Sequence, residues 1–132
     1  MTKLAENVVE FIARPLFGKI ATVSRDGTPH VTPIWYMYVD GKLLVNTAHG
    51  RVKYGNMKRT GRAALLVDDG YGYVLFSGRA RRATERDPLK DIETLAVRYN
   101  GEEQGKKQTR EVFARQKRVT FEIIPDKVIV SL

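Results

Sequence analysis

The sequence predicts a mainly β domain with short helices, built as a small antiparallel barrel. Apolar segments of strand length recur along its 132 residues, and turn signals rich in glycine and aspartate separate several of them. Consecutive hairpins of this kind form an antiparallel sheet, which closes most economically as a barrel. The length suits one domain with a real core, so we expect residues 1–132 to form a single domain.

Six or seven strands are expected. The longest candidate contains Pro29 and Pro33, which cannot donate to a strand ladder, so it is expected at a sheet edge or with a bulge. Asp40-Gly41 is a strong hairpin signal, and Pro125-Asp126 is expected to turn the chain between the last two strands. The expected strands span residues 17–24, 29–39, 42–47, 63–69, 73–83, 119–124 and 127–132.

Three or four short helices complete the prediction. Apolar residues at helical spacing precede Pro15 near the N-terminus. Asp87-Pro88 favours a helix start, because aspartate caps the helix and proline suits its first position. Residues 101–109 are expected to form a polar loop or the approach to a last short helix. The expected helices span residues 4–12, 51–59, 88–100 and 110–118.

The composition excludes several kinds of site. The chain has no cysteine, which excludes a disulfide framework, a thiol nucleophile and cysteine-ligated metals. His30 and His49 have no carboxylate or nucleophile at an informative spacing, so neither a metal site nor an acid/base pair is predicted. No apolar run approaches the roughly 20 residues that cross a bilayer, and no signal peptide is recognisable, so we expect a cytoplasmic protein.

The charge balance favours an anionic partner. The formal net charge is +8, which suits a nucleic acid, a membrane surface or a polyanionic small molecule. The alternative is a basic surface that serves solubility alone. Arg79 and Arg81 share one face of an expected strand, and they form either a solvated edge or part of an anion groove.

The start of the expected helix 51–59 is the sharpest candidate for an anion site. The first amides of a helix lack internal partners, and the helix dipole favours an anion there. Arg51 and Lys53 lie on this first turn, and Asn56 lies near Lys53 on the same helical surface. Two cations at the positive end of a dipole oppose it unless an anion neutralises both. The alternative is an ordinary solvated basic helix start.

The segment 34–39 is apolar on both faces. We expect one face to contact the barrel core and the other a subunit or a planar ligand. Alternatively, its aromatic residues simply pack against core and surface. The two faces consist of Trp35, Met37 and Val39, and of Ile34, Tyr36 and Tyr38.

In this order, the elements resemble the pyridoxamine 5'-phosphate oxidase-like split β-barrel family, and more narrowly its small flavin- or deazaflavin-dependent oxidoreductases. The matching features are ATVSRDGTPHVTPIWY, the hairpin VDGKLLVNT, and RVKYGNM, which fits an R-x-K-x-x-N pattern. The resemblance covers residues 17–85 well and the rest loosely. The C-terminal segment rich in Trp, Ser, Gln and Arg that a true pyridoxamine-phosphate oxidase uses has no counterpart, so vitamin B6 oxidation is not expected.

The resemblance implies a homodimer with cofactor sites at the subunit interface, where FMN or the deazaflavin coenzyme F-420 exchanges a hydride with a small organic substrate. The positive charge leans toward F-420, which carries a polyglutamate tail. Arg51 and Lys53 would hold the cofactor phosphate, Asn56 would support the turn, and segment 71–78 of the other subunit would close the pocket. The implied cofactor-binding residues are Pro33, Ile34, Trp35, Tyr36, Thr47, Ala48, Arg51, Lys53 and Asn56.

Two alternatives stay open. The chain is a flavin- or F-420-binding carrier without turnover, or a small barrel that binds nucleic acid. The second is less favoured, because the basic residues are spread over many elements and the aromatic residues lie in apolar strands. No membrane partner is expected.

Overall fold

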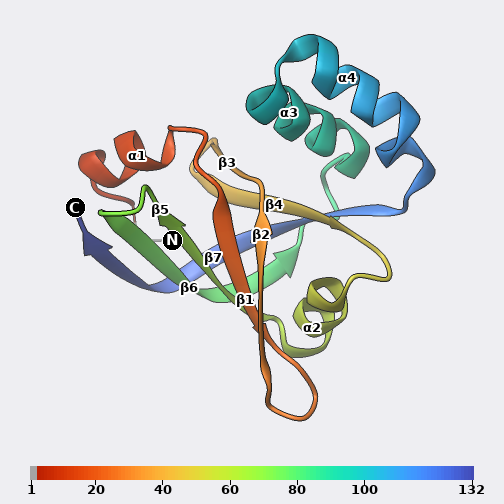
Figure 1. Cartoon of the computed structure of the whole chain (residues 1–132). Coiled ribbons are helices and arrows are strands. Elements are labelled where there is room, and N and C mark those ends of the chain that lie inside the picture. Colours follow the sequence, from red (N-terminus) through yellow and green to blue (C-terminus); the bar gives the residue numbers. More distant parts are fainter. Residues whose placement is uncertain (1–2) are drawn as a thin grey trace.

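The computed structural model describes residues 3–132, which form one antiparallel sheet of seven strands with helices around it (Figure 1). The strands are β1 Gly18–Val23, β2 Pro29–Ile34, β3 Tyr36–Val39, β4 Lys42–Ala48, β5 Arg62–Asp68, β6 Tyr73–Arg82 and β7 Arg118–Ser131. The helices are α1 Glu6–Ile12, α2 Val52–Thr60, α3 Pro88–Asn100 and α4 Glu102–Glu111, followed by the 3-10 helix η1 Phe113–Arg115.

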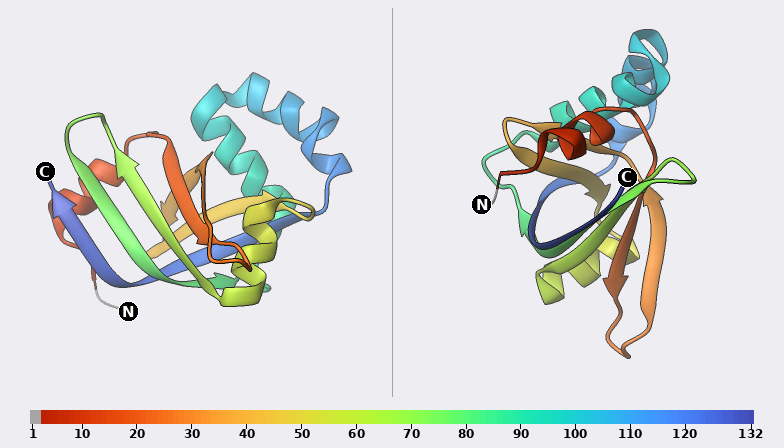
Figure 2. Two further views of the ribbon diagram at one scale, coloured as in Figure 1. Left: turned by 60° about the horizontal axis from the view of Figure 1, so that its bottom comes forward. Right: turned by 90° about the vertical axis from the view of Figure 1, so that its left-hand side faces the viewer.

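The sheet curls into the predicted barrel. Its strand order is β2-β1-β5-β6-β7-β4-β3, so β2 and β3 are the two edges. Only Trp35 separates these edges along the chain, which holds them together at one corner (Figure 2). The fold class expected from the hairpin pattern is confirmed.

The expected single strand 29–39 is wrong in one respect, because it breaks at Trp35. Its first half pairs with β1, where Ile34 lies opposite Gly18, and its second half pairs with β4, where Tyr36 lies opposite Val45. Each half has a neighbour on one side only, which is where a strand containing Pro33 is tolerated. The expected edge position is therefore confirmed.

The expected turn at Pro125-Asp126 is wrong, because β7 runs through it without reversing. The register of β7 against β6 shifts by one residue between Ser77 and Gly78, which leaves Asp126 as the extra residue of a β-bulge. Proline is accepted at a bulge because no ladder hydrogen bond is required of it there. Gly78 allows the close crossing, since a Cβ at this position would lie 2.2 Å from the Ile124 carbonyl oxygen.

The barrel interior is the main core. Tyr36, Phe76 and Phe121 are among its largest fully buried side chains. Helix α1 adds Val8 and Ile12, and α2 adds Tyr54 and Met57, so these two helices close the barrel at opposite ends (Figure 1). This packing fixes α2 against the barrel and so fixes the direction in which its first turn points.

Helices α3 and α4 form a hairpin that stands outside the barrel (Figures 1 and 2). Asp87 caps α3 as predicted, accepting hydrogen bonds from the amides of Leu89 and Lys90. Gly105 lets the helices approach closely, because a Cβ there would lie 2.5 Å from the Val97 nitrogen. A second apolar cluster joins α3 to the sheet through Met37, Leu44, Ile92 and Leu95.

This hairpin corrects two expectations. Residues 102–111 are a full helix rather than a loop, and the expected helix 110–118 is limited to the end of α4 and η1. Only Gly105 and Thr109 of α4 are buried, so the apolar period that would have indicated a helix is absent. The expectation that the second face of residues 34–39 contacts a subunit or a ligand is also partly wrong, because Met37 packs on α3.

No helix within residues 3–132 is both long enough and apolar enough to cross a membrane.

Candidate functional site

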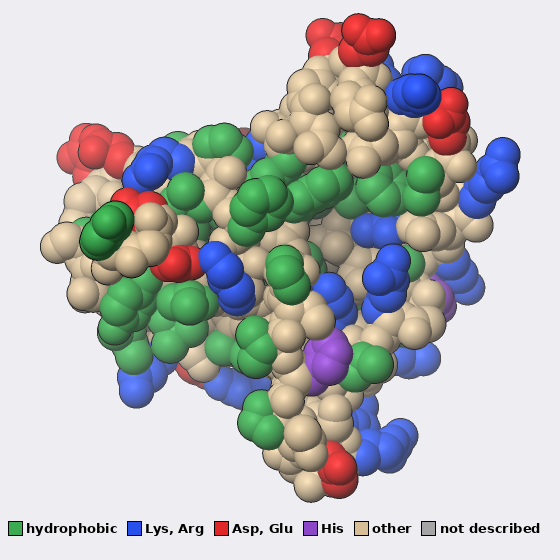
Figure 3. Space-filling view, in the orientation of Figure 1, with side chains coloured by type: hydrophobic (Ala, Val, Ile, Leu, Met, Phe, Trp, Pro, Cys, Tyr) green, Lys and Arg blue, Asp and Glu red, His purple; other side chains and the backbone are tan. Residues whose placement is uncertain are grey.

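A cleft of about 340 Å³ lies between the barrel and the helical hairpin. In the orientation of Figure 3 it is the hollow below the helices, with hydrophobic side chains along its upper edge and lysine and arginine side chains below and to the right. The corner between β2 and β3, the end of β4, the start of α2, α3, η1 and the start of β7 all contribute to it. Its lining residues are Phe17, Pro33, Ile34, Trp35, Asn46, Thr47, Arg51, Lys53, Ile92, Phe113 and Arg118.

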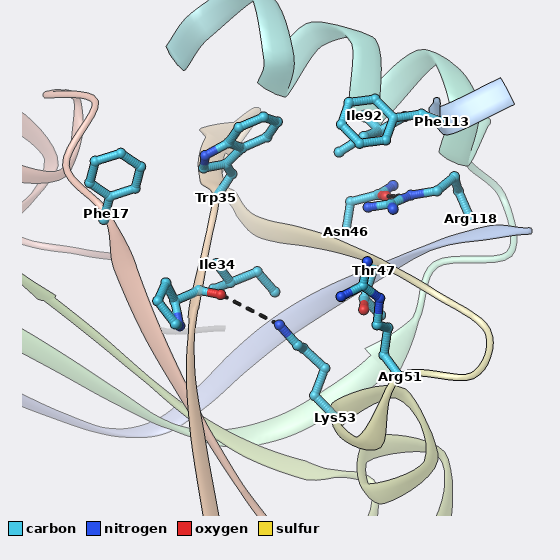
Figure 4. A pocket seen from close by; sticks show the side chains of 11 residues that line it. Phe17, Ile34, Trp35, Asn46, Thr47, Arg51, Lys53, Ile92, Phe113 and Arg118 are labelled. Atoms are coloured by element: carbon cyan, nitrogen blue, oxygen red, sulfur yellow. Dashed lines mark hydrogen bonds between the residues drawn. The ribbon is translucent and has the colours of Figure 1, made fainter. Parts of the chain in front are cut away.

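The start of α2 forms a cradle on one side of the cleft, which consists of Arg51, Lys53 and the first amides of the helix. The chain turns from β4 through Gly50, whose φ of 91° favours glycine, and reaches Arg51 in extended conformation as the N-cap. Among residues 3–132 no side chain caps this end, and no acidic residue lies in its first turn, so these residues supply no anion to the first amides and the positive dipole end. Lys53 reaches across the cleft toward β2, where its Nζ donates to the Pro33 carbonyl at 3.4 Å (Figure 4).

Three cations gather in the cleft without a counter-ion. Within residues 3–132, Arg51, Lys53 and Arg118 take part in none of the seven ion pairs. Burial, and then the charges of Arg51 and Arg118, lower the pKa of Lys53. Burial and the charge of Arg51 lower the pKa of Arg118 to about 10. The cleft is thus a positively charged site in which an anion relieves repulsion.

Arg118 was not among the predicted site residues, because the sequence placed it at the end of a helix. It begins β7 instead, and Cα pairing with Ala48 brings it beside the cradle at the end of β4. Its Nε donates to the Asn46 Oδ1 at 2.9 Å and its Nη1 to the Gln116 Oε1 at 2.7 Å. Its guanidinium also lies 5.0 Å from the centre of the Phe113 ring.

Asn46 connects Arg118 to a buried polar network. The Asn46 Nδ2 donates to the Thr120 Oγ1 at 3.0 Å, and Thr120 donates in turn to the Asp91 Oδ2 at 2.8 Å. Asp91, only 4% exposed, also accepts two hydrogen bonds from Arg86. The network joins β4, β7 and α3, so it holds both the guanidinium and the helical hairpin in place.

The wall opposite the cradle is apolar and flat. Trp35 stacks on Tyr99 with ring centres 5.3 Å apart and planes 10° apart, and Phe17 also stacks on Tyr99, with ring centres 5.6 Å apart. Phe113 meets Trp35 edge-on at 6.2 Å. A flat molecule that enters the cleft therefore meets an aromatic surface on one side and cations on another.

Six of the nine predicted residues line this one cleft. They come from the β2–β3 corner, the end of β4 and the start of α2, which the barrel brings together although they are distant in sequence. These six are Pro33, Ile34, Trp35, Thr47, Arg51 and Lys53.

The other three predicted residues do not line the cleft. Tyr36 is fully buried in the barrel, where its hydroxyl donates to the Arg14 carbonyl at 2.8 Å. Ala48 is buried at the end of β4. Asn56 faces β1 and its Nδ2 donates to the Thr22 Oγ1 at 3.0 Å, so it anchors α2 to the barrel. Strand alternation and the helix period explain why such near neighbours face away.

Arg81 does not extend the anion groove that the sequence left open. It forms ion pairs with Glu85 and Glu122, at 2.9 Å and 2.8 Å, which raise its pKa. Its charge is thus neutralised within the chain, in contrast to that of Arg118.

Comparison with known proteins gives a consistent picture. A family model described as pyridoxamine 5'-phosphate oxidase matches residues 4–130. The structure of a protein named F420 reductase is 25% identical, with a TM-score of 0.72 over 96% of this chain and 98% of that one. A conserved hypothetical protein of Mycobacterium tuberculosis is also 25% identical, with a TM-score of 0.77 over 97% and 84%. The heme storage protein HutZ of Vibrio cholerae, 15% identical with a TM-score of 0.70 over 98% and 96%, shares the fold alone.

Proposed function

The chain belongs to the pyridoxamine 5'-phosphate oxidase family, and on this basis we propose that it is an oxidoreductase that uses a bound FMN or coenzyme F-420. The cofactor would exchange a hydride with a small organic substrate. The observation that carries the proposal is the cleft, in which Arg51 and Lys53 form no ion pair within residues 3–132, at a helix start without a side-chain cap there.

The donor set fits a phosphate ester. Arginine offers parallel N–H groups that match phosphate oxygens, lysine adds a point charge, and the first amides of α2 add neutral donors. Arg51 and Lys53 would hold the phosphate, while Asn56 keeps α2 in position through its bond to Thr22. A bound phosphate would therefore neutralise cations that otherwise repel one another in the cleft.

The rest of the cleft fits a flat ring. Pro33, Ile34 and Trp35 lie along one wall and would shield a bound ring from water on that side. The lining residues include no aspartate, glutamate, histidine or cysteine, so they offer no acid/base pair for chemistry of their own. The bound cofactor would supply the hydride chemistry, and the chain would position and shield it.

Of the two cofactors, we favour F-420. The match to the protein named F420 reductase covers 96% of this chain and 98% of that one. The net charge of +8 also suits the polyanionic tail of F-420. Haem, which the name of HutZ associates with that relative, is less suited, because no histidine lines the cleft.

An absorption titration of the purified protein with FMN and with F-420 tests the proposal. We expect at least one of them to bind with a Kd below about 100 µM. If neither binds in this range, the proposal is wrong.

Turnover separates an enzyme from a carrier. Stopped-flow absorption follows whether the bound ring is reduced by NADPH or by an F-420-recycling glucose-6-phosphate dehydrogenase system. An oxidoreductase passes the hydride on to a substrate, whereas a carrier binds tightly and its ring neither gains nor loses a hydride with any partner tested.

Cofactor affinity is expected to fall at alkaline pH. The phosphate gains no further charge as the pH rises above about 7, whereas Lys53, with its pKa lowered below 10.5, loses its charge as the pH rises toward that value. The affinity is thus full near pH 7 and decreases toward pH 10. Lys53→Met should bind more weakly at neutral pH and show a flatter profile, and an unchanged profile in this variant would contradict the role of Lys53.

The chain is expected to form a homodimer. Val23 and Val31 on the outer face of the sheet are 50% and 59% exposed, beside an apolar groove that lies over the paired strands β1 and β5. The apolar run of β6 contributes less to this surface, since Val74 and Phe76 are fully buried. Sedimentation at micromolar concentration should show twice the chain mass of 15.0 kDa, and a species of 15.0 kDa alone would contradict a dimer.

A further inference from the structure

We infer that Arg118 binds a carboxylate of the substrate at the end of the cleft formed by Phe113 and Ile92. The substrate class is a small acid with a flat apolar body. This inference rests on the proposed function, in which Arg51 and Lys53 hold the cofactor phosphate at the other side of the cleft.

The guanidinium of Arg118 is held in a fixed orientation by two hydrogen bonds, and one of its nitrogens has no acceptor among residues 3–132. Asn46 accepts from its Nε and Gln116 accepts from its Nη1, while its Nη2 has no acceptor among residues 3–132. Asn46 is itself only 5% exposed and is bonded to Thr120. The half-buried cation is therefore oriented before any ligand arrives, which reduces the entropy lost on binding.

Two other half-buried arginines have internal counter-ions, whereas Arg59 and Arg98 donate to backbone carbonyl groups instead. Arg81 pairs with Glu85 and Glu122, and Arg86 pairs with Asp91. Arg118 is surrounded instead by neutral amide oxygens and an aromatic ring. Amide oxygens orient a guanidinium without neutralising it, so its charge stays available to an incoming anion.

The surroundings of Arg118 define the rest of the ligand. Phe113, Ile92 and Trp35 provide an apolar, partly aromatic surface above it (Figure 4). No acidic side chain lines the cleft to repel a carboxylate. A flat acid would place its ring against this surface and its carboxylate on the free edge of the guanidinium.

The side chains of Lys53 and Arg118 point to different sides of the cleft, although Arg118 lies close enough to the cradle that, besides burial, the charge of Arg51 lowers its pKa. Lys53 reaches β2, where it bonds to Pro33, whereas Arg118 lies on the α3 side beside Asn46 (Figure 4). The cradle already offers two cations and free helix amides to one phosphate. Arg118 is thus expected to contribute to the binding of the substrate and not of the cofactor.

Calorimetry with 2-naphthoate and 2-naphthamide tests this inference on the full chain, both with and without FMN or F-420. We expect Arg118→Gln to weaken 2-naphthoate binding by about 10- to 100-fold, while binding of 2-naphthamide and of the cofactor changes by less than about threefold. Arg115→Gln is the matched control, since Arg115 is exposed three residues earlier and should leave all three affinities unchanged.

A second variant covers the case in which Arg118→Gln does not fold. Gln116→Glu places a carboxylate where the amide oxygen now accepts from Arg118, which gives the guanidinium an internal counter-ion. It should weaken 2-naphthoate binding several-fold and leave 2-naphthamide binding unchanged.

Two results would overturn the inference. The first is equal 2-naphthoate binding by the wild type and the variants. The second is a loss of cofactor affinity in Arg118→Gln without a loss for 2-naphthoate, which would assign Arg118 to the cofactor phosphate. Failure of the wild type to bind either cofactor would count against the proposed function alone, because 2-naphthoate binding to the cofactor-free protein still decides the role of Arg118.

Discussion

Replacing both Arg51 and Lys53 with alanine is expected to weaken cofactor binding by about 100-fold or more. Each side chain offers a charge-assisted hydrogen bond worth roughly 1.5–3 kcal/mol, of which exposure to solvent removes part. Single variants should therefore lose about tenfold each, since about 1.4 kcal/mol corresponds to a factor of ten. Fluorescence or absorption titration with FMN and F-420 measures the three affinities directly.

The free energy of unfolding of the double variant should stay near that of the wild type. Neither residue forms an ion pair within residues 3–132, so their removal breaks no internal charge contact and relieves repulsion. Lys107→Ala, which removes an exposed charge on α4, is the matched control and should bind the cofactor as the wild type does. A double variant with unchanged affinity would mean that the cradle binds no cofactor phosphate.

Asp91→Ala is expected to lower the free energy of unfolding by about 3 kcal/mol, the lower end of the range for breaking a buried ion pair. The carboxylate accepts from Arg86 at 2.8 and 2.9 Å and from Thr120 at 2.8 Å. Its removal leaves a partly buried guanidinium without a partner and frees the hydroxyl on which Asn46 depends. Arg86 retains some exposure, which limits the loss.

Urea unfolding followed by circular dichroism measures this effect. Asp91→Asn should cost less, since one oxygen still accepts from Thr120, although the charge and the second acceptor for Arg86 are lost. Glu93→Ala, on the same helix and without a hydrogen-bond partner among residues 3–132, should be nearly neutral. If the free energy of unfolding of Asp91→Ala lies within about 0.5 kcal/mol of that of Glu93→Ala, the network does not hold α3 on the sheet.

Local signals in the sequence account for most of the fold. The Asp40-Gly41 turn and the Asp87 cap act within a few residues of themselves, so each identifies its hairpin or helix correctly. The break at Trp35 and the bulge beside Gly78 depend instead on which strands lie next to them. Sheet order is a long-range property, so neither feature was visible in local patterns.

The same distinction applies to the site. Arg51 and Lys53 were recognisable because a strand end, a glycine turn and a basic helix start follow one another along the chain. Arg118 reaches the cleft through the pairing of β7 with β4, which joins residues about 70 positions apart. No local pattern marks such a residue. Tyr36 was predicted as a cofactor-binding residue because it belongs to an apolar segment that borders the cleft. Strand alternation, however, places its side chain on the core side of that segment.

A crystal structure of the protein loaded with FMN or F-420 would show directly whether Arg51 and Lys53 hold the cofactor. We expect the cofactor phosphate within hydrogen-bonding distance of both Arg51 and Lys53, at the first turn of α2, with the ring in the cleft beside Trp35. A phosphate bound elsewhere, with Arg51 and Lys53 left in solvent, would contradict this expectation.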